Sequence, residues 1–126
     1  MQAARFCGST GEAMEVLASD LLGVPVLKVT GDLDHLTAPA LEKAVGDALS
    51  ADGMRLLVDL ADCPYLDSGG LSVLLFTLRE VREKGWIGVI APNANLLRLF
   101  EITGLAAAPD FRVFSSCQEA MVALEG

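Results

Sequence analysis

The sequence predicts one α/β domain, built on a mixed, mostly parallel sheet with an antiparallel N-terminal strand and about four helices. Strand-like and helix-like segments alternate after residue 24, which is typical of parallel strands joined by helices. The chain has 126 residues, the size of one ordinary domain. Hydrophobic residues make up 52% of it and charged residues 21%, which is enough to fill a core.

The first expected strand, residues 14–23 (MEVLASDLLG), comes directly before the second, residues 24–31 (VPVLKVTG). So short a connection permits only a hairpin around Gly23, so the two strands should pair antiparallel. The residues before them show no comparable pattern and lack the apolar centre of a signal peptide. We therefore expect a flexible tail over residues 1–13 and one domain over residues 14–126.

The middle of the chain should form a helix, a buried strand and a longer helix. Thr37 is a suitable N-cap for a helix over residues 37–50. The nearly continuous apolar run RLLVDLAD, residues 55–62, predicts a strand covered on both faces. The longer helix is expected over residues 68–85, where Gly85 would end it.

The long helix has two recognisable sides. Ser68, Ser72 and Phe76 recur at intervals of four and should form one column. Phe76 is then either covered by a neighbouring helix or an anchor of a binding surface. Another side carries an apolar stripe that should face the sheet, made of Leu71, Leu74, Leu75, Leu78 and Val81.

The last third continues the alternation. We expect a strand over residues 86–92, a helix over residues 93–104 and a strand over residues 111–116. Ser116 and Glu119 have the spacing of a capping box, so a final helix should begin there.

Composition excludes several classes of function. Nine basic and seventeen acidic residues give a net charge of −8, which repels nucleic acid and anionic membrane surfaces. Cys7, Cys63 and Cys117 are far apart, so we expect free thiols in a reducing cytoplasm. His35 is the only histidine and there is no Cys-x-x-Cys motif, so neither a metal site nor a cofactor is expected.

Residues 67–70 read Asp-Ser-Gly-Gly, a sequence that also surrounds the nucleophilic serine of trypsin-like proteases. Those enzymes place an oxyanion-hole glycine directly before the Asp-Ser pair. The elbow of α/β-hydrolases, Gly-x-Ser-x-Gly, needs a glycine at the same position. Leu66 occupies it here. Ser68 is therefore not expected to be catalytic, and no enzyme is predicted.

Three stretches together resemble the STAS-domain anti-anti-sigma factors, or anti-sigma factor antagonists. VTGDLDHLTAPALEKAV resembles their strand, turn and first helix, and LLVDLADCPYLDSGGLSVLL resembles their central strand, phosphorylation loop and second helix. NANLLRLFEITGL resembles their third helix. The resemblance spans residues 14–126 and implies a single STAS domain.

The resemblance implies a phosphorylation switch. An unphosphorylated antagonist binds an anti-sigma factor, which is usually also a serine kinase of the histidine-kinase-like ATPase type. The phosphorylated antagonist releases it, and a serine phosphatase resets the cycle. Carried over, Ser68 is the phosphate acceptor, Asp67 precedes it, Gly70 is the motif glycine and Asp34 matches the aspartate of the family's Gly-x-x-Asp turn.

The residues themselves leave roles open at this loop. Ser68 at a helix start is often only an N-cap, although a helix N-terminus also favours a phosphate. Asp67 is either a capping residue or a direct partner contact. Gly69 stands where the family has a second hydroxyl residue, and the loss of that hydroxyl is expected to weaken either kinase recognition or partner binding. Two adjacent glycines at a helix start also predict a more flexible loop.

Two other functions remain open for such a domain. One is a non-phosphorylated STAS subunit of a membrane lipid or ion transport system, and the other is a small-ligand-sensing STAS module. The residues expected to bind the partner are Asp34, Asp67, Ser68, Gly69, Gly70, Ser72 and Phe76.

Overall fold

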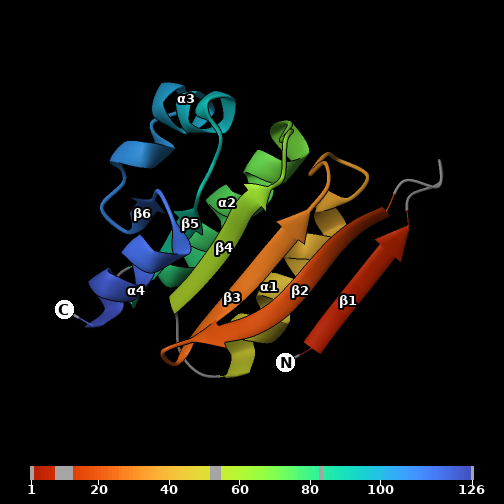
Figure 1. Ribbon diagram of the computed structural model, residues 1–126. Coiled ribbons are helices and arrows are strands. Elements are labelled where there is room, and N and C mark those ends of the chain that lie inside the picture. The colour runs from red at the N-terminus through yellow and green to blue at the C-terminus, as the bar shows by residue number, and fades with distance from the viewer. Residues whose placement is uncertain (1, 8–12, 52–54, 83, 126) are drawn as a thin grey trace.

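A computed structural model describes residues 2–7, 13–51, 55–82 and 84–125. They form a six-stranded sheet in the order β1-β2-β3-β4-β5-β6 (Figure 1). β2 pairs antiparallel with both β1 and β3, while β3 to β6 are parallel. The strands are β1 (Gln2–Cys7), β2 (Ala13–Leu21), β3 (Val24–Thr30), β4 (Arg55–Asp62), β5 (Trp86–Ile90) and β6 (Phe111–Phe114).

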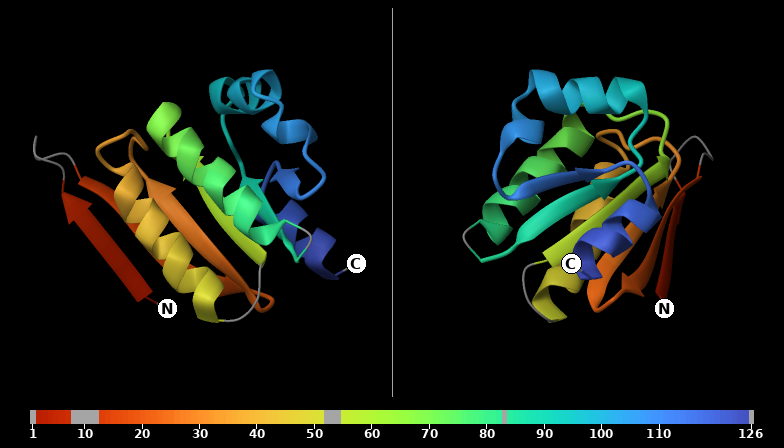
Figure 2. Two further views of the ribbon diagram at one scale, coloured as in Figure 1. Left: turned by 180° about the vertical axis from the view of Figure 1, so that it is seen from behind. Right: turned by 60° about the vertical axis from the view of Figure 1, so that its left-hand side comes forward.

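Helices cover the sheet unequally. The helices are α1 (Ala38–Ala51), α2 (Ser68–Val81), α3 (Ala94–Ile102) and α4 (Cys117–Glu125), with a short 3-10 helix η1 (Leu105–Ala107). α1 and α2 lie side by side on one face, and α4 lies on the other (Figure 2). α3 sits beyond one end of the sheet. This predicted α/β architecture, with an antiparallel N-terminal strand and four α-helices, is confirmed.

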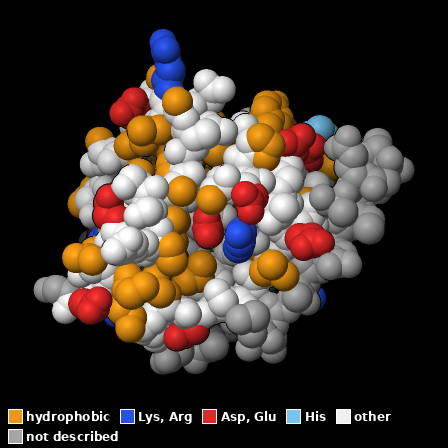
Figure 3. Space-filling view, in the orientation of Figure 1, with side chains coloured by type: hydrophobic (Ala, Val, Ile, Leu, Met, Phe, Trp, Pro, Cys, Tyr) orange, Lys and Arg blue, Asp and Glu red, His pale blue; other side chains and the backbone are white. Residues whose placement is uncertain are grey.

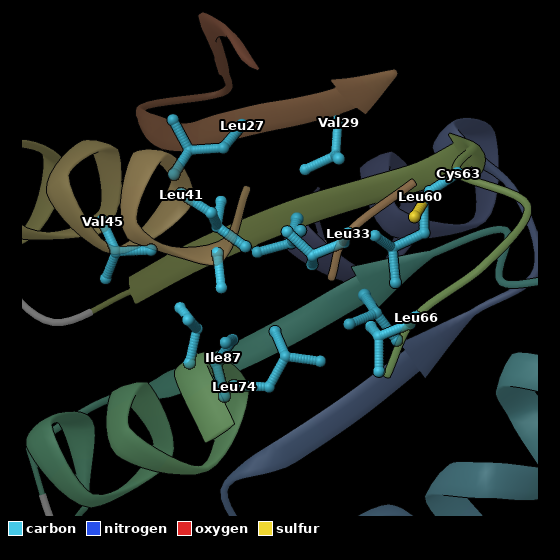
Figure 4. Close-up of a cluster of buried hydrophobic side chains, with 14 of the residues drawn as sticks. Leu27, Val29, Leu33, Leu41, Val45, Leu60, Cys63, Leu66, Leu74 and Ile87 are labelled. Carbon is cyan, nitrogen blue, oxygen red and sulfur yellow. The ribbon is translucent and has the colours of Figure 1, made fainter. Parts of the chain in front are cut away.

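The larger hydrophobic core lies between the sheet and the α1–α2 layer (Figure 4). Leu33 and Leu66, from the connections that lead into α1 and α2, also point into this core and are buried. They anchor both connections to the body of the domain. The other side chains labelled in the close-up are Leu27, Val29, Leu41, Val45, Leu60, Cys63, Leu74 and Ile87.

The opposite face of the sheet is only partly covered. A smaller core there joins α4 to the sheet through residues that include Ala120, Trp86 and Phe114. Hydrophobic side chains gather over α4, while charged side chains occupy the open part of the face (Figure 3). Lys28 pairs with Asp62 at 3.2 Å on this face.

The N-terminal segment corrects one prediction. We expected residues 1–13 to lie outside the fold as a flexible tail, but Gln2–Cys7 forms β1 along the free edge of β2. The segment QAARFC has little strand propensity of its own. It pairs because β2 offers a row of unpaired backbone groups, and that partner is not evident from the segment alone.

The buried side of α2 differs in part from the predicted stripe. Val73 and Thr77 are buried, whereas Leu75 is exposed. The Thr77 hydroxyl donates to the Val73 carbonyl at 2.7 Å, so its polar group is satisfied inside the helix. The remaining positions of the predicted stripe are buried or half-buried, and they are Leu71, Leu74, Leu78 and Val81.

Other element boundaries agree closely with prediction. The hairpin between β2 and β3 turns at Gly23, as expected. α2 ends before Gly85, because Arg82 leaves the helical region with ψ 130°. At α4 the Ser116 hydroxyl accepts from the Glu119 N–H at 3.0 Å, which confirms the cap. The Glu119 carboxylate accepts from the Ser115 hydroxyl instead of closing the predicted box.

Candidate functional site

Two connections leave the carboxyl ends of the neighbouring parallel strands β3 and β4 (Figure 1). Residues 31–37 lead into α1, and residues 63–67 lead into α2. Leu33 forms a parallel bridge with Leu66, and its N–H donates to the Tyr65 carbonyl at 2.9 Å. The two connections therefore make one continuous surface at the end of the sheet where α/β proteins commonly bind ligands.

Asp67 holds this surface together. It is the N-cap of α2, and its Oδ1 accepts from the N–H groups of Gly69 at 2.7 Å and Gly70 at 3.3 Å. Its Oδ2 accepts from the backbone N–H of His35 at 3.2 Å and lies 3.5 Å from His35 Nδ1. One carboxylate thus fixes both the start of α2 and the turn before α1. The interpretation of Asp67 as a capping residue is confirmed.

The electrostatics of Asp67 follow from these contacts. Desolvation raises the pKa of its carboxyl group, but the hydrogen bonds from Gly69, Gly70 and His35 outweigh that effect. The pKa therefore lies below its ordinary value. Asp67 is ionised at neutral pH and places a negative charge next to Ser68.

Ser68 is the first residue of α2 and is exposed. The capping role that serine often has at a helix start belongs to Asp67 instead. The Ser68 carbonyl accepts from the Ser72 hydroxyl at 2.7 Å. Ser68 is therefore accessible to solvent and stands where the N–H groups and dipole of a helix favour negative charge.

The two glycines after Ser68 are positions of close approach. A Cβ atom on Gly70 would lie 2.7 Å from the Leu33 carbonyl oxygen and 3.0 Å from Leu66 Cγ. A Cβ atom on Gly69 would lie 2.6 Å from His35 Cα and 2.9 Å from His35 N. Beside the predicted loop flexibility, the two glycines therefore meet a packing requirement that the sequence did not indicate.

The Asp34 turn, residues 34–37, is closed by its own side chains. Asp34 Oδ1 accepts from the N–H groups of Leu36 at 2.9 Å and Thr37 at 3.0 Å. Thr37 Oγ1 accepts from the Asp34 N–H and donates to the Asp32 carbonyl, both at 2.9 Å. The Thr37 hydroxyl, which we expected to cap α1, thus closes the turn. The Asp34 carboxylate shapes the surface by accepting hydrogen bonds from backbone N–H groups.

An open pocket of about 290 Å³ lies between α1 and α2, beside the start of α2. The predicted column of Ser68, Ser72 and Phe76 is exposed, and the last two line this pocket. The remaining lining residues are His35, Ala38, Pro39, Glu42, Gly69 and Val73. The α1 side of the pocket was not predicted, because contacts between two helices leave no local signal in either one.

Asn93 is a further positioning residue that sequence reasoning assigned only to a helix boundary. Its side-chain amide donates to the Pro64 carbonyl at 3.1 Å, and its Oδ1 accepts from the Leu96 N–H at 2.9 Å. Asn93 thereby ties the start of α3 to the connection that leads to Ser68.

Within residues 2–7, 13–51, 55–82 and 84–125, no three His, Cys, Asp or Glu side chains gather as metal ligands would. Over the same ranges, no helix combines the length and apolar character needed to span a membrane.

Comparison with known proteins identifies the family. The profile of the family described as "Mlab, STAS domain" matches residues 18–113, and the chain belongs to this family of STAS domains. The anti-sigma-F factor antagonist RsfB of Mycobacterium tuberculosis is 31% identical over 118 residues, which cover 94% of this chain and 95% of that protein. The anti-sigma-B factor antagonist of Bacillus subtilis is 37% identical over 81 residues, 63% of this chain and 72% of its own.

A solved structure agrees with these relatives. The crystal structure of an anti-sigma factor antagonist from Mycobacterium paratuberculosis superposes with a TM-score of 0.80. It is 31% identical in sequence, and the match covers 90% of this chain and 95% of that one. The resemblance stated from the three motifs is confirmed.

Proposed function

We propose that this protein is an anti-sigma factor antagonist whose binding to an anti-sigma factor is controlled by phosphorylation of Ser68. It would thereby regulate transcription that depends on a sigma factor. The observation that carries the proposal is an exposed serine at the first position of α2, beside the Asp67 carboxylate. The names of the relatives, matched over nearly the whole chain, support the same role.

The proposed binding face consists of the Asp34 turn, residues 66–70 and the Ser72–Phe76 part of the α2 column. Large apolar side chains are exposed on or directly beside each of these three segments. Leu36 is 62% exposed, Tyr65 53% and Phe76 50%. Exposed aromatic side chains of this kind are frequent anchors of protein interfaces. The face therefore suits a protein partner.

The proposed switch acts through local charge. Phosphoserine adds about −1.5 to −2 charges and three acceptor oxygens. The N-terminus of α2 tolerates this charge, so the helix should persist. A partner surface that fits a neutral serine beside ionised Asp67 would face two adjacent negative groups. Misplaced charge of this kind costs several kcal/mol at an interface, so release needs no refolding.

Two enzymes would add and remove the phosphate on Ser68. The anti-sigma factor would be a serine kinase of the histidine-kinase-like ATPase type, and a serine phosphatase would reset Ser68. The protein itself would act by binding in the cytoplasm, without catalytic activity. Neither nucleic acid nor a membrane is proposed as a partner, because the chain carries a net charge of −8.

The partner class is tested by affinity capture from the native cell extract. Immobilised wild type and Ser68→Ala should retain a histidine-kinase-like ATPase, and Ser68→Asp should retain less of it. Mass spectrometry identifies the retained proteins. Recovery of membrane transporter subunits on all three resins, without such an ATPase, would favour the transport-subunit function and contradict the proposal.

A further inference from the structure

We propose that Gly69 is a positioning residue that joins the Asp34 turn and the start of α2 into one composite binding surface. The missing side chain lets the backbone of His35 rest directly on α2. The description of this surface as the site for an anti-sigma factor rests on the proposed function, but the contact itself does not.

The contact between Gly69 and His35 involves backbone atoms of His35, so a side chain at position 69 cannot be accommodated by a change of rotamer. A Cβ atom at position 69 would meet His35 Cα at 2.6 Å and His35 N at 2.9 Å. Both distances are shorter than two such atoms can approach. No change of rotamer relieves an overlap with backbone, so any other residue at position 69 requires one of the two segments to move.

The start of α2 is the better fixed of the two segments. Gly70 packs against Leu33 and Leu66 in the core, and Asp67 caps the helix through two N–H groups. The side chain of His35 is 76% exposed, and the backbone N–H of His35 donates to Asp67 Oδ2. A side chain at position 69 should therefore displace the Asp34 turn and leave α2 in place.

Displacement of the turn would reshape the surface without altering Ser68. His35, Ala38 and Pro39 line the α1 side of the pocket, and Phe76 lines the α2 side. Moving the turn takes His35 away from the α2 side of the pocket and removes the His35 N–H from Asp67. The relative placement of the Asp34 turn, the phosphorylation site and the pocket thus depends on the absence of one Cβ atom.

The test compares Gly69→Ala with Gly46→Ala, which controls for adding a methyl group. Gly46 lies exposed in α1, and apart from its two chain neighbours and its own helix backbone no described atom lies within 4 Å of where its Cβ atom would stand. In Gly69→Ala the amide signals of residues 34–37 should shift, the His35 amide should exchange faster, and the pKa of Asp67 should rise. Gly46→Ala should change none of these. If folded Gly69→Ala kept the wild-type exchange rate of the His35 amide and the wild-type pKa of Asp67, the proposal would be overturned.

Two further measurements keep the test decisive if Gly69→Ala does not fold. Wild-type protein should show a nuclear Overhauser contact between the α-protons of Gly69 and His35, and its absence would overturn the proposal. His35→Ala removes the imidazole but keeps the backbone contact. The hydrogen bond from the backbone N–H at position 35 to Asp67 should therefore persist in this variant. Loss of that hydrogen bond would show that the imidazole, and not the backbone, makes the contact, and would also overturn the proposal. None of these readouts uses a partner, so they succeed or fail independently of the proposed function.

Discussion

The carboxylate of Asp67 accepts a hydrogen bond from the backbone N–H of His35 at 3.2 Å, across 32 positions of the chain. The same side chain caps α2 through Gly69 and Gly70. The sequence suggested either a helix cap or a partner contact for Asp67, and the structure shows that this cap also fixes a turn on another element. The phosphorylation site proposed here is built on that shared carboxylate.

Acid should remove the contribution of Asp67 to stability. Its pKa is lowered in the folded state. The stabilisation is therefore present above the unfolded value of about 3.9 and is lost as pH falls through the folded pKa. Wild type should melt at a higher temperature than Asp67→Asn at pH 7, and the difference should shrink below about pH 4. Thermal unfolding from neutral to strongly acidic pH measures this.

The control is Asp32→Asn, which removes an exposed carboxylate outside the cap. It corrects for the general effect of one fewer acidic group. A difference between wild type and Asp67→Asn that stays constant across the whole pH range would show that the ionised cap contributes nothing.

Phe76→Ala should separate binding from folding. Phe76 is 50% exposed, so its removal should barely change the melting temperature. As an interface anchor it should cost about 1–2 kcal/mol or more of binding free energy. The matched variant Leu74→Ala removes a fully buried side chain of the same helix and should cost about 2–5 kcal/mol of stability. Calorimetry with the captured partner measures the loss of binding, and thermal melts measure the loss of stability. Unchanged affinity of Phe76→Ala for the partner would remove Phe76 from the binding face.

Cys63 should resist alkylation in the folded protein. Burial raises the pKa of its thiol to about 11, so about one molecule in a thousand carries the thiolate at about pH 8. Cys117 is exposed and should react first with iodoacetamide. Peptide mass spectrometry over time measures both rates, with urea-unfolded protein as the control in which Cys63 reacts quickly. Equal rates in the folded protein would contradict the burial of Cys63.

Ser68 should not behave as a nucleophilic serine. Leu66 stands where an oxyanion-hole glycine would be needed, and the Asp67 carboxylate is already engaged by backbone N–H groups. Serine-directed fluorophosphonate probes should therefore leave the protein unlabelled, while a serine hydrolase in the same reaction is labelled. Stoichiometric labelling of Ser68 would overturn its assignment as a phosphate acceptor.

The order of elements was predictable because each strand and helix after residue 24 carries a strong local pattern. The run RLLVDLAD marks β4, and Asn93 marks the start of α3 as its N-cap. β1 was missed because its pairing with β2 depends on a distant partner. The buried side of α2 was assigned partly wrongly because a leucine was preferred to Thr77, whose hydroxyl is satisfied by the helix backbone.

The part of the candidate site that lies within one short stretch of sequence was predictable. Asp67, Ser68 and the column through Phe76 follow from consecutive residues and helical spacing. The contribution of His35 and the packing role of Gly69 were not predictable, because both depend on how two separate turns approach each other. No periodicity in the sequence encodes a distance between turns.

A phosphate on Ser68 is proposed to control partner binding by local charge. The most direct measurement is the affinity of wild-type protein for the captured anti-sigma factor, before and after stoichiometric phosphorylation, with Ser68→Ala as the non-phosphorylatable control. We expect at least a hundredfold loss of affinity, about 2.7 kcal/mol, in the phosphorylated wild type and no loss in Ser68→Ala treated with the kinase. Equal affinities of the phosphorylated and unphosphorylated forms, or phosphate uptake by Ser68→Ala, would contradict the claim.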